Sequence, residues 1–240
     1  MKFPIGIQDF KKIREGGFVY VDKTALLYKL ANEGTIYFLS RPRRFGKSLL
    51  VSTLKYYFGG ERELFSGLAI DALEKDWNSY PIFHVDFNST NYTKSGDALS
   101  KLIKGTVEDW ERQYGYVGNE EFDYGKRFAE LLKHVHATTG KRCVVLVDEY
   151  DKPLLDVLDS GMVEQGGDGK EMLLEDINRE ILKGFYSAFK SADQDLRFVL
   201  LTGVTKFSQV SVFSGFNQPA DISMSTVYDA VCGITEDELE

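Results

Sequence analysis

The residues best suited to chemistry form a basic loop at 41–48, with the sequence Arg-Pro-Arg-Arg-Phe-Gly-Lys-Ser. Gly46 lets the backbone approach a phosphate closely, Lys47 offers a compact cation to the β and γ phosphates, and Ser48 carries a hydroxyl that can ligate Mg²⁺. An apolar run precedes the loop and a helix-period segment follows it, so the N–H groups of a helix terminus also face the phosphates. The pattern predicts a Walker A phosphate loop.

The first position of this loop departs from the common pattern. Arg41 stands where the consensus has a glycine, so its side chain must either point away from the phosphates or take part in binding. Arg43 and Arg44 can pair with phosphate in a bidentate way or remain surface cations, and the sequence does not separate these roles. The alternative is a basic, solvated turn before a helix, which leaves the Gly-Lys-Ser order unexplained. The predicted nucleotide-binding residues are Arg41, Arg43, Arg44, Phe45, Gly46, Lys47, Ser48 and Leu49.

Two acidic residues follow a second apolar run. The segment 143–147 is apolar throughout, as in a strand buried on both faces, and Asp148 and Glu149 come directly after it. Ligands of open α/β sheets bind at the carboxyl ends of the strands, so these acids should lie beside the phosphate loop. We expect Asp148 and Ser48 to hold Mg²⁺, and Glu149 to polarise the attacking water. The alternative is a strand that ends in solvated acids, which the accompanying phosphate loop disfavours.

The acidic pair also bears on the choice of nucleotide. GTPases and nucleotide kinases generally lack the second carboxylate. The chain has no Asn-Lys-x-Asp sequence, the usual guanine-reading element. The sequence therefore favours ATP over GTP.

Two residues near these acids keep two interpretations each. Asp151 either touches the metal shell or caps the turn that Pro153 fixes. Thr202 ends another apolar run, and it either presents its hydroxyl to the γ-phosphate or the attacking water, the position called sensor 1, or is an ordinary strand-end threonine. The predicted catalytic residues are Lys47, Glu149 and Thr202.

Strand-length apolar runs alternate with longer helix-period segments, which predicts an α/β fold with a mostly parallel sheet covered by helices. The predicted strands are 35–40, 82–87, 143–147 and 198–202, with a short fifth at 222–224. The predicted helices are 47–58, 96–114, 123–136 and 171–191. Asp22 is expected to cap another helix, and the Gly-rich segment 161–169 is expected to be a mobile loop.

Composition narrows the class of protein. The formal charge of −8 argues against broad, non-specific attraction to nucleic acid. No apolar run approaches the roughly 20 residues that a membrane helix needs, and the N-terminus has no secretory signal pattern. Cys143 and Cys232 are the two cysteines, so a disulfide framework is not expected. We expect a cytoplasmic protein with no membrane partner.

The motifs together resemble the AAA-ATPase-like family of bacteria and archaea, whose members commonly carry a C-terminal PD-(D/E)XK nuclease-like region. The resemblance rests on five segments that span nearly the whole chain: 4–24, 38–50, 144–153, 200–217 and the DIS and CGITEDEL sequences near the end. The resemblance extends to the phosphate loop, which that family writes with the same Arg-Pro-Arg-Arg-Phe-Gly-Lys-Ser. The resemblance implies that Lys47 and Ser48 bind nucleotide and that Asp148 and Glu149 form the Walker B pair. It also implies a three-layer α/β/α P-loop NTPase fold with an extra strand between the Walker A and Walker B strands.

The domain organisation follows from the same comparison. We expect 1–240 to be one P-loop domain, with a lid or linker region beginning at about residue 205. The sequence at 235–238 has the form of a helix start, which suggests the N-terminal part of a longer protein, although a frayed tail is the alternative. The resemblance implies a nuclease-like region in the full-length chain, and nucleic acid contact is expected through that region alone.

Three functions compete at this point. The first is an ATP-hydrolysing switch or motor that controls an attached effector, and the second is a nucleotide-binding scaffold with negligible hydrolysis that acts through protein contacts. A P-loop kinase is a weaker third, because the glutamate and the lack of an evident acceptor lid argue against it. The sequence leaves the oligomeric state open, and nothing selects Arg179 or Arg197 as an arginine finger.

Overall fold

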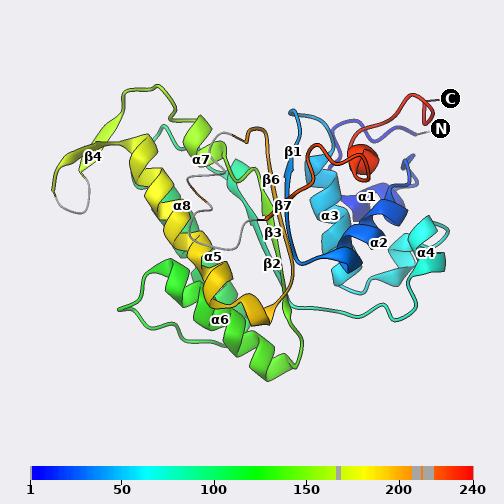
Figure 1. The fold of residues 1–240 in the computed structure, drawn as a ribbon, viewed down its shortest axis with the longest axis horizontal. Helices are drawn as coiled ribbons and strands as arrows, with labels where there is room; N and C mark the ends of the chain where they lie inside the picture. The colour runs from blue at the N-terminus through cyan, green and yellow to red at the C-terminus, as the bar shows by residue number, and fades with distance from the viewer. Residues whose placement is uncertain (1, 166–168, 207–211, 213–218, 240) are drawn as a thin grey trace.

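The computed structural model describes residues 2–165, 169–206, 212 and 219–239, and its centre is a sheet of five parallel strands in the order β2-β3-β6-β1-β7 (Figure 1). The strands are β1 (Ile36–Ser40), β2 (Ile82–Asp86), β3 (Cys143–Asp148), β6 (Leu196–Gly203) and β7 (Ala220–Asp221). The α/β class and the mostly parallel sheet predicted from the sequence are therefore confirmed.

Strands β3 and β6 form the middle of the sheet. All six residues of β3 are buried, because helices cover both faces of the sheet and leave no face to solvent. Strand β6 pairs with β3 on one side and with β1 on the other, with Val147 opposite Leu201 and Leu39 opposite Thr202. Asp86 at the end of β2 lies opposite Asp148 at the end of β3. The carboxyl ends of four strands thus meet along one edge.

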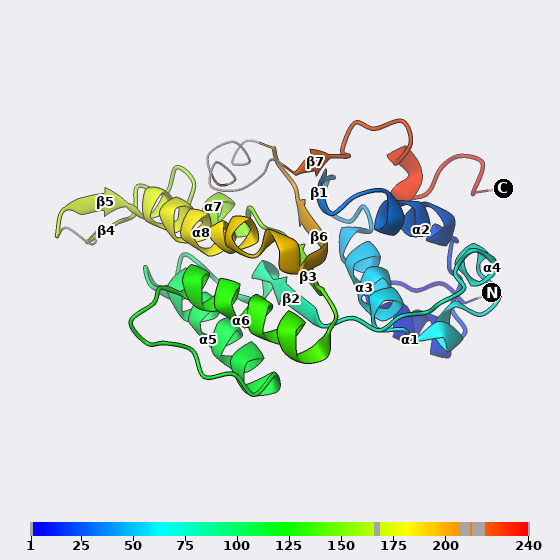
Figure 2. The same cartoon turned by 60° about the horizontal axis from the view of Figure 1, so that its bottom comes forward.

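Two groups of helices cover the two faces (Figures 1 and 2). The first face carries α5 (Ala98–Gln113), α6 (Tyr124–Thr139) and α8 (Leu174–Ser191). The second face carries α1 (Phe10–Glu15), α2 (Thr24–Glu33), α3 (Lys47–Phe58) and α4 (Ala69–Leu73). Alternate residues of one strand face different cores, so Val145 packs with the first group and Leu146 with the second. The molecule therefore has three layers.

Shorter elements connect these layers. They are η1 (Arg62–Phe65), η2 (Phe87–Ser89), α7 (Lys152–Leu155), β4 (Val163–Gln165), β5 (Glu171–Leu173), η3 (Asp193–Asp195) and η4 (Asp229–Val231). Strands β4 and β5 form an antiparallel hairpin that projects beyond the end of α8 (Figure 2). No helix in the described parts of the chain is long and apolar enough to cross a membrane.

Most predicted elements agree with the structure to within about three residues, and α3 agrees at both ends. The predicted fifth strand at 222–224 is wrong, because β7 is Ala220–Asp221 and the chain turns after it, with the N–H of Ser225 bonded to the carbonyl of Ile222. The helix predicted from 171 begins at Leu174, since 171–173 pair with β4. Part of the predicted loop at 161–169 is β4, and 166–168 lie outside the described residues.

The predicted cap at Asp22 is also corrected. Helix α2 has Lys23 at its N-cap, without a side-chain hydrogen bond. Asp22 instead accepts hydrogen bonds from the N–H groups of Thr24, at 2.8 Å, and Ala69, at 2.7 Å. Its carboxylate therefore joins the starts of α2 and α4.

Candidate functional site

The loop at 41–46 connects the carboxyl end of β1 to the first residue of α3. Its N–H at Arg41 still donates to the carbonyl of Gly203, at 3.1 Å, so the loop leaves the sheet beside the end of β6. Two residues take left-handed backbone angles, Arg44 with φ 66° and Gly46 with φ 83°. Gly46 sits at the N-cap of α3, where a glycine adopts this conformation without the strain that a Cβ would add.

Lys47 is the most enclosed cation of the loop. Its side chain is 3% exposed, and its Nζ donates to the carbonyls of Arg41 at 3.0 Å and Pro42 at 3.2 Å. The same Nζ lies 3.2 Å from Oε1 of Glu149. Two residues predicted from separate motifs, about 100 positions apart, thus form one ion pair.

The end of β3 is tied to the end of β6 through Thr202, which is fully buried. The hydroxyl of Thr202 donates to Oδ1 of Asp148 at 2.6 Å, and the N–H of Glu149 points to the same hydroxyl at 3.4 Å. Thr202 therefore contacts both members of the acidic pair directly. The sequence leaves Thr202 as either a contact to phosphate or water or an ordinary strand-end threonine, and nothing in the structure tests the first of these.

Glu149 has an unusual backbone and an unusual acidity. Its φ is +55°, in the left-handed region that a residue with a Cβ adopts at a cost of roughly 1 to 3 kcal/mol. Burial raises the pKa of its carboxyl above the ordinary value, and the charge of Lys47 opposes that rise. Burial also raises the pKa of Asp86.

Asp151 takes a place that neither sequence interpretation described. Its carboxylate is fully buried and accepts from the N–H of Val204 at 3.0 Å and from the N–H and hydroxyl of Thr205 at 2.7 and 2.9 Å. No cation pairs with it among the described residues. Asp151 therefore holds the segment that follows β6.

Arg41 is tied to the C-terminal part of the chain. Its guanidinium donates to the carbonyls of Ser223, Tyr228 and Asp229. Gly233 lies against the loop as well, because a Cβ placed on Gly46 would come within 3.6 Å of the N of Gly233. The sequence left the side chain of Arg41 either pointing away from the phosphates or taking part in their binding. In the structure it points toward these three carbonyls.

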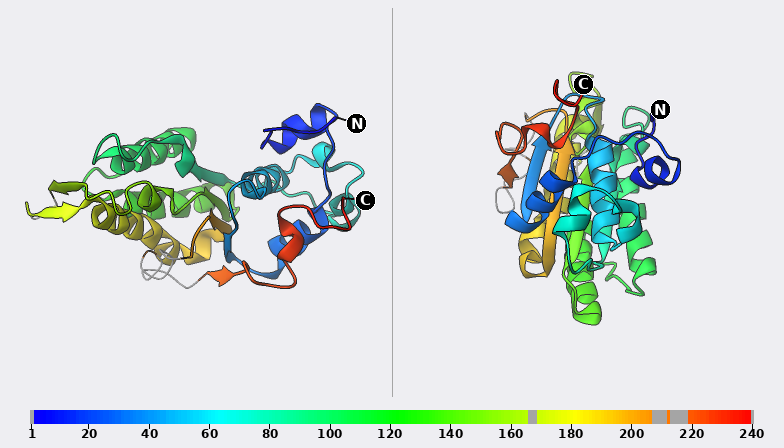
Figure 3. Two further views of the ribbon diagram at one scale, coloured as in Figure 1. Left: turned by 90° about the horizontal axis from the view of Figure 1, so that it is seen from above. Right: turned by 90° about the vertical axis from the view of Figure 1, so that its right-hand side faces the viewer.

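The C-terminal segment also reaches the second helix. Lys23 pairs with Glu238 at 2.5 Å, and the hydroxyl of Tyr228 donates to Glu33 at 2.8 Å. Seen from above, the red C-terminal segment lies beside the blue helix α2 (Figure 3, left). The C-terminal segment thus contacts both the loop at 41–46 and the helix α2.

The other predicted loop residues are more accessible. Arg43, Arg44 and Phe45 are exposed, while Ser48 and Leu49 in the first turn of α3 are half-buried. Ser48 and Asp148, the predicted Mg²⁺ ligands, lie in the first turn of α3 and at the end of β3. The described residues contain no group of three or more Asp, Glu, His or Cys side chains that could hold a metal ion.

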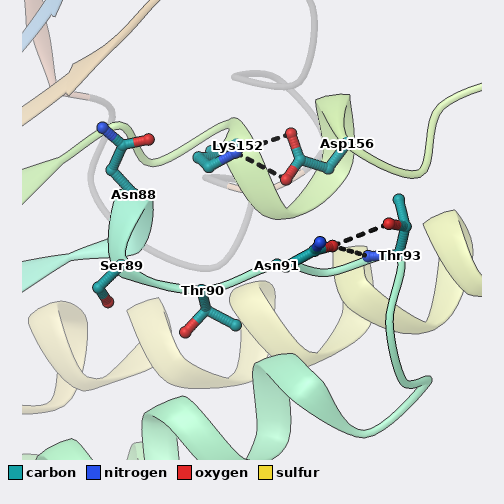
Figure 4. Close-up of a pocket in the computed structure, with 7 residues that line it drawn as sticks. All are labelled: Asn88, Ser89, Thr90, Asn91, Thr93, Lys152 and Asp156. Atoms are coloured by element: carbon teal, nitrogen blue, oxygen red, sulfur yellow. Dashed lines mark hydrogen bonds and ion pairs between the residues drawn. The ribbon is translucent and has the colours of Figure 1, made fainter.

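A polar pocket with a volume of about 590 Å³ lies between η2 and α7 (Figure 4). Its lining residues are Asn88, Ser89, Thr90, Asn91, Thr93, Lys152 and Asp156. The amine of Lys152 is held by Asp156 at 2.7 Å, and the N–H of Lys152 donates to the carbonyl of Glu149 at 3.0 Å. The pocket therefore flanks the acidic strand ends, and no predicted site residue lines it.

The structure brings together more residues than the sequence patterns indicated. Asp86 could have been found, because it ends a predicted strand at the ligand-binding edge of the sheet. Ser223 and Gly233 lie in the DIS and CGITEDEL sequences that carry the family resemblance, but the sequence assigned them no role at the site. Arg179 pairs with Glu175 and Asp176 on its own helix, so the structure gives it a local role.

Comparison with known proteins gives the same family that the motifs suggested. The sequence model of a family described as predicted AAA-ATPase matches residues 4–213. A relative from Azotobacter chroococcum mcd 1, described as an uncharacterized protein in the vnfD 5' region, is 42% identical over 244 residues. The alignment covers the whole of this chain and 44% of the relative, so the chain spans less than half of that protein's length. No solved structure matches the chain.

Proposed function

Because the chain belongs to the predicted AAA-ATPase family, we propose that it binds ATP with Mg²⁺ at the loop 41–48 and hydrolyses it beside Glu149. One observation carries the proposal. The amine of Lys47 and the carboxylate of Glu149 lie 3.2 Å apart, although Lys47 begins α3 and Glu149 follows β3. Because the basic loop and the acidic strand end meet so closely, a triphosphate that replaces Glu149 as the partner of Lys47 would have the water-activating base beside it.

Each residue then has a distinct task. Lys47 neutralises the β and γ phosphates, the exposed N–H groups at the start of α3 bind phosphate oxygens, and Glu149 orients and polarises the attacking water. Ser48 and Asp148 would hold Mg²⁺, which supplies charge stabilisation at the phosphates when bound. Thr202 keeps Asp148 in place through its 2.6 Å hydrogen bond.

The sheet order supports this assignment of roles. Strand β6 lies between β1, which leads into the loop, and β3, which leads into the acids. We take β6 as the inserted strand of a P-loop ATPase. Its position puts Thr202 between the two motif strands, within reach of both.

In the wider protein, ATP turnover would act as a switch or motor for an attached effector. The Azotobacter relative is more than twice as long as this chain, which leaves room for such a region in that protein. The second candidate is a scaffold in which bound ATP stabilises one conformation without turnover. The Lys47–Glu149 pair supports the first candidate, because both functions require Lys47 to bind phosphate and hydrolysis alone requires Glu149 as the water-activating base.

Phosphate release from Mg-ATP tests the proposal directly. We expect turnover by the wild type that Glu149→Gln lowers by about two orders of magnitude. Asp148→Asn should instead make nucleotide binding less dependent on Mg²⁺. Binding of ATP without turnover would favour the scaffold. Absence of ATP binding would refute both.

A further inference from the structure

A set of contacts joins the residues after Glu149 to the residues after Thr202. The N–H of Tyr150 donates to the carbonyl of Thr202 at 2.8 Å, and its hydroxyl donates to the carbonyl of Thr205 at 3.0 Å. Asp151 accepts from Val204 and Thr205, with distances between 2.7 and 3.0 Å for its closest oxygen. We call the contacts of Tyr150 and Asp151 with 202–205 the strand-end clasp.

The clasp is tightly packed as well as hydrogen-bonded. A Cβ placed on Gly203 would lie 2.4 Å from the ring of Tyr150 and 2.8 Å from Oδ1 of Asp151. Real Cβ atoms do not approach other atoms so closely, so the ring of Tyr150 can occupy this place only because residue 203 is glycine. Both clasp side chains are fully buried.

Glu149 lies between Asp148 and Tyr150, and both of these neighbours are hydrogen-bonded to Thr202. On one side Asp148 is bonded to the hydroxyl of Thr202, and on the other Tyr150 is bonded to its carbonyl. The residue between them has φ +55°, a conformation that persists only where the surroundings over-determine it. The residues on both sides of Glu149 are thus bonded to Thr202, and the carboxylate between them lies 3.2 Å from Lys47.

We propose that Asp151 is a positioning residue for Glu149: through the strand-end clasp it fixes the backbone that aims the water-activating carboxylate. This inference rests on the proposed ATPase function. Asp151 itself touches neither phosphate nor water in this role. Its carboxylate accepts hydrogen bonds from the N–H of Val204 and from the N–H and hydroxyl of Thr205. Asp151 therefore acts through the backbone and through Tyr150.

The first test compares Asp151→Asn with wild type. An asparagine keeps the volume, and its amide oxygen can take the place of Oδ2, which accepts the three close hydrogen bonds. That oxygen carries no charge, and the amide NH2 then faces the N–H of Val204, which Oδ1 accepts at 3.3 Å, so the clasp is weakened. We expect kcat to fall by roughly 10- to 100-fold, while the Kd for Mg-ATP changes less than about threefold, because the loop and Lys47 are untouched. The matched control is Asp156→Asn, a nearby carboxylate that pairs with Lys152 and makes no clasp contact. It should keep the wild-type kcat.

A double-mutant cycle separates positioning from a general structural role. If Asp151 acts through Glu149, adding Asp151→Asn to Glu149→Gln should lower single-turnover rates by less than about twofold further. A full multiplicative loss in that background would overturn the proposal. Should Asp151→Asn fail to fold, Thr205→Val removes the hydroxyl contact alone and should lower kcat by about threefold, with the same behaviour in the cycle.

Hydrogen exchange at backbone amides tests the positioning role of Asp151 separately from the proposed ATPase function. If the wild type binds ATP but never hydrolyses it, the proposed function fails, while the clasp can still be measured. Asp151→Asn should then speed exchange at the amides of Tyr150, Val204 and Thr205 together, and leave β2 and α6 unchanged. Faster exchange at 204–205 with an unchanged Tyr150 amide would show that Asp151 does not constrain the chain at Glu149, and would refute the inference.

Discussion

Replacing Glu149 by Gln should change three measurable quantities, and the ion pair with Lys47 sets their sizes. At 3.2 Å the two charges attract by about 5 kcal/mol at an effective dielectric constant of about 20. Burial offsets much of this, since the Lys47 side chain is 3% exposed and that of Glu149 is 16% exposed. The glutamine amide oxygen can still accept from Lys47, which also keeps its bonds to the two loop carbonyls. We expect the free energy of unfolding without nucleotide to fall by about 1 to 2 kcal/mol.

The same ion pair predicts tighter nucleotide binding. In the wild type, a phosphate that reaches Lys47 must compete with Glu149 for the ammonium. In Glu149→Gln that competitor carries no charge, and the phosphate restores the missing negative partner. The variant can recover all of the lost interaction energy, up to about 1 to 2 kcal/mol, when it binds nucleotide. This free energy corresponds to an affinity for nucleotide about 5- to 30-fold higher than that of the wild type. Hydrolysis should fall by about 100-fold or more, because the water-activating base is gone.

Two assays check these values. Chemical denaturation gives the change in unfolding free energy, and calorimetry with a non-hydrolysable ATP analogue gives the affinities of both proteins. Glu108→Gln is the matched control, since its partner Lys104 is 4.0 Å away and both side chains are exposed. It should leave stability and affinity unchanged to within about 0.5 kcal/mol. Equal stability and equal affinity for wild type and Glu149→Gln would refute the energetic role of the pair.

Three further predictions concern other parts of the molecule. Lys47→Ala should weaken ATP binding at least about tenfold by calorimetry, because it removes the cation nearest the phosphates; unchanged affinity would refute the loop assignment. Gly203→Ala should lower the unfolding free energy by about 1 to 3 kcal/mol in denaturant titrations, since its Cβ would meet the ring of Tyr150 at 2.4 Å; a neutral result would mean that the ring moves freely. Burial and the charge of Lys55 depress the pKa of His84, so the stability it contributes is present above the unfolded pKa of about 6.5 and is lost as pH falls below it. His84→Gln should therefore lose less stability than wild type between pH 7.5 and 5.5, and an equal loss would contradict this.

The sequence predicted the parts of the site whose signals are local. The phosphate loop and the acidic strand end each carry their chemistry within a few consecutive residues, and the buried strand 143–147 is apolar at every position. Their meeting at one edge follows from the general geometry of parallel sheets, and the 3.2 Å pair is the structural result.

The remaining features depend on contacts between distant parts of the chain. The direction of Arg41 depends on carbonyls more than 180 positions later, and carbonyl groups have no sequence signature. The sequence around Asp151 indicates a place in the metal shell or a cap of the turn at Pro153, because these signals come from neighbouring residues. Its hydrogen-bond partners in the structure lie 53 and 54 positions later in the chain. The left-handed backbone of Glu149 is likewise imposed by its neighbours in space. A glutamate at position 149 gives no indication of a left-handed backbone.

The placement of β1 between β6 and β7 has a consequence for synthesis on the ribosome. Ile36 pairs with Val199, and Tyr37 pairs with Ala220, so both neighbours of β1 are made roughly 160 residues or more after it. At a synthesis rate of roughly 5 to 20 residues per second, β1 waits about 10 to 30 s with both edges unpaired. The loop after β1 also lacks its partners during this time. The N–H of Arg41 bonds to the carbonyl of Gly203, and its guanidinium bonds to carbonyls of residues after 220. If the chain binds ATP as proposed, a nascent chain should gain that affinity only after residues 203 and 223–229 have been made, and until then both edges of β1 are open to pairing with other chains.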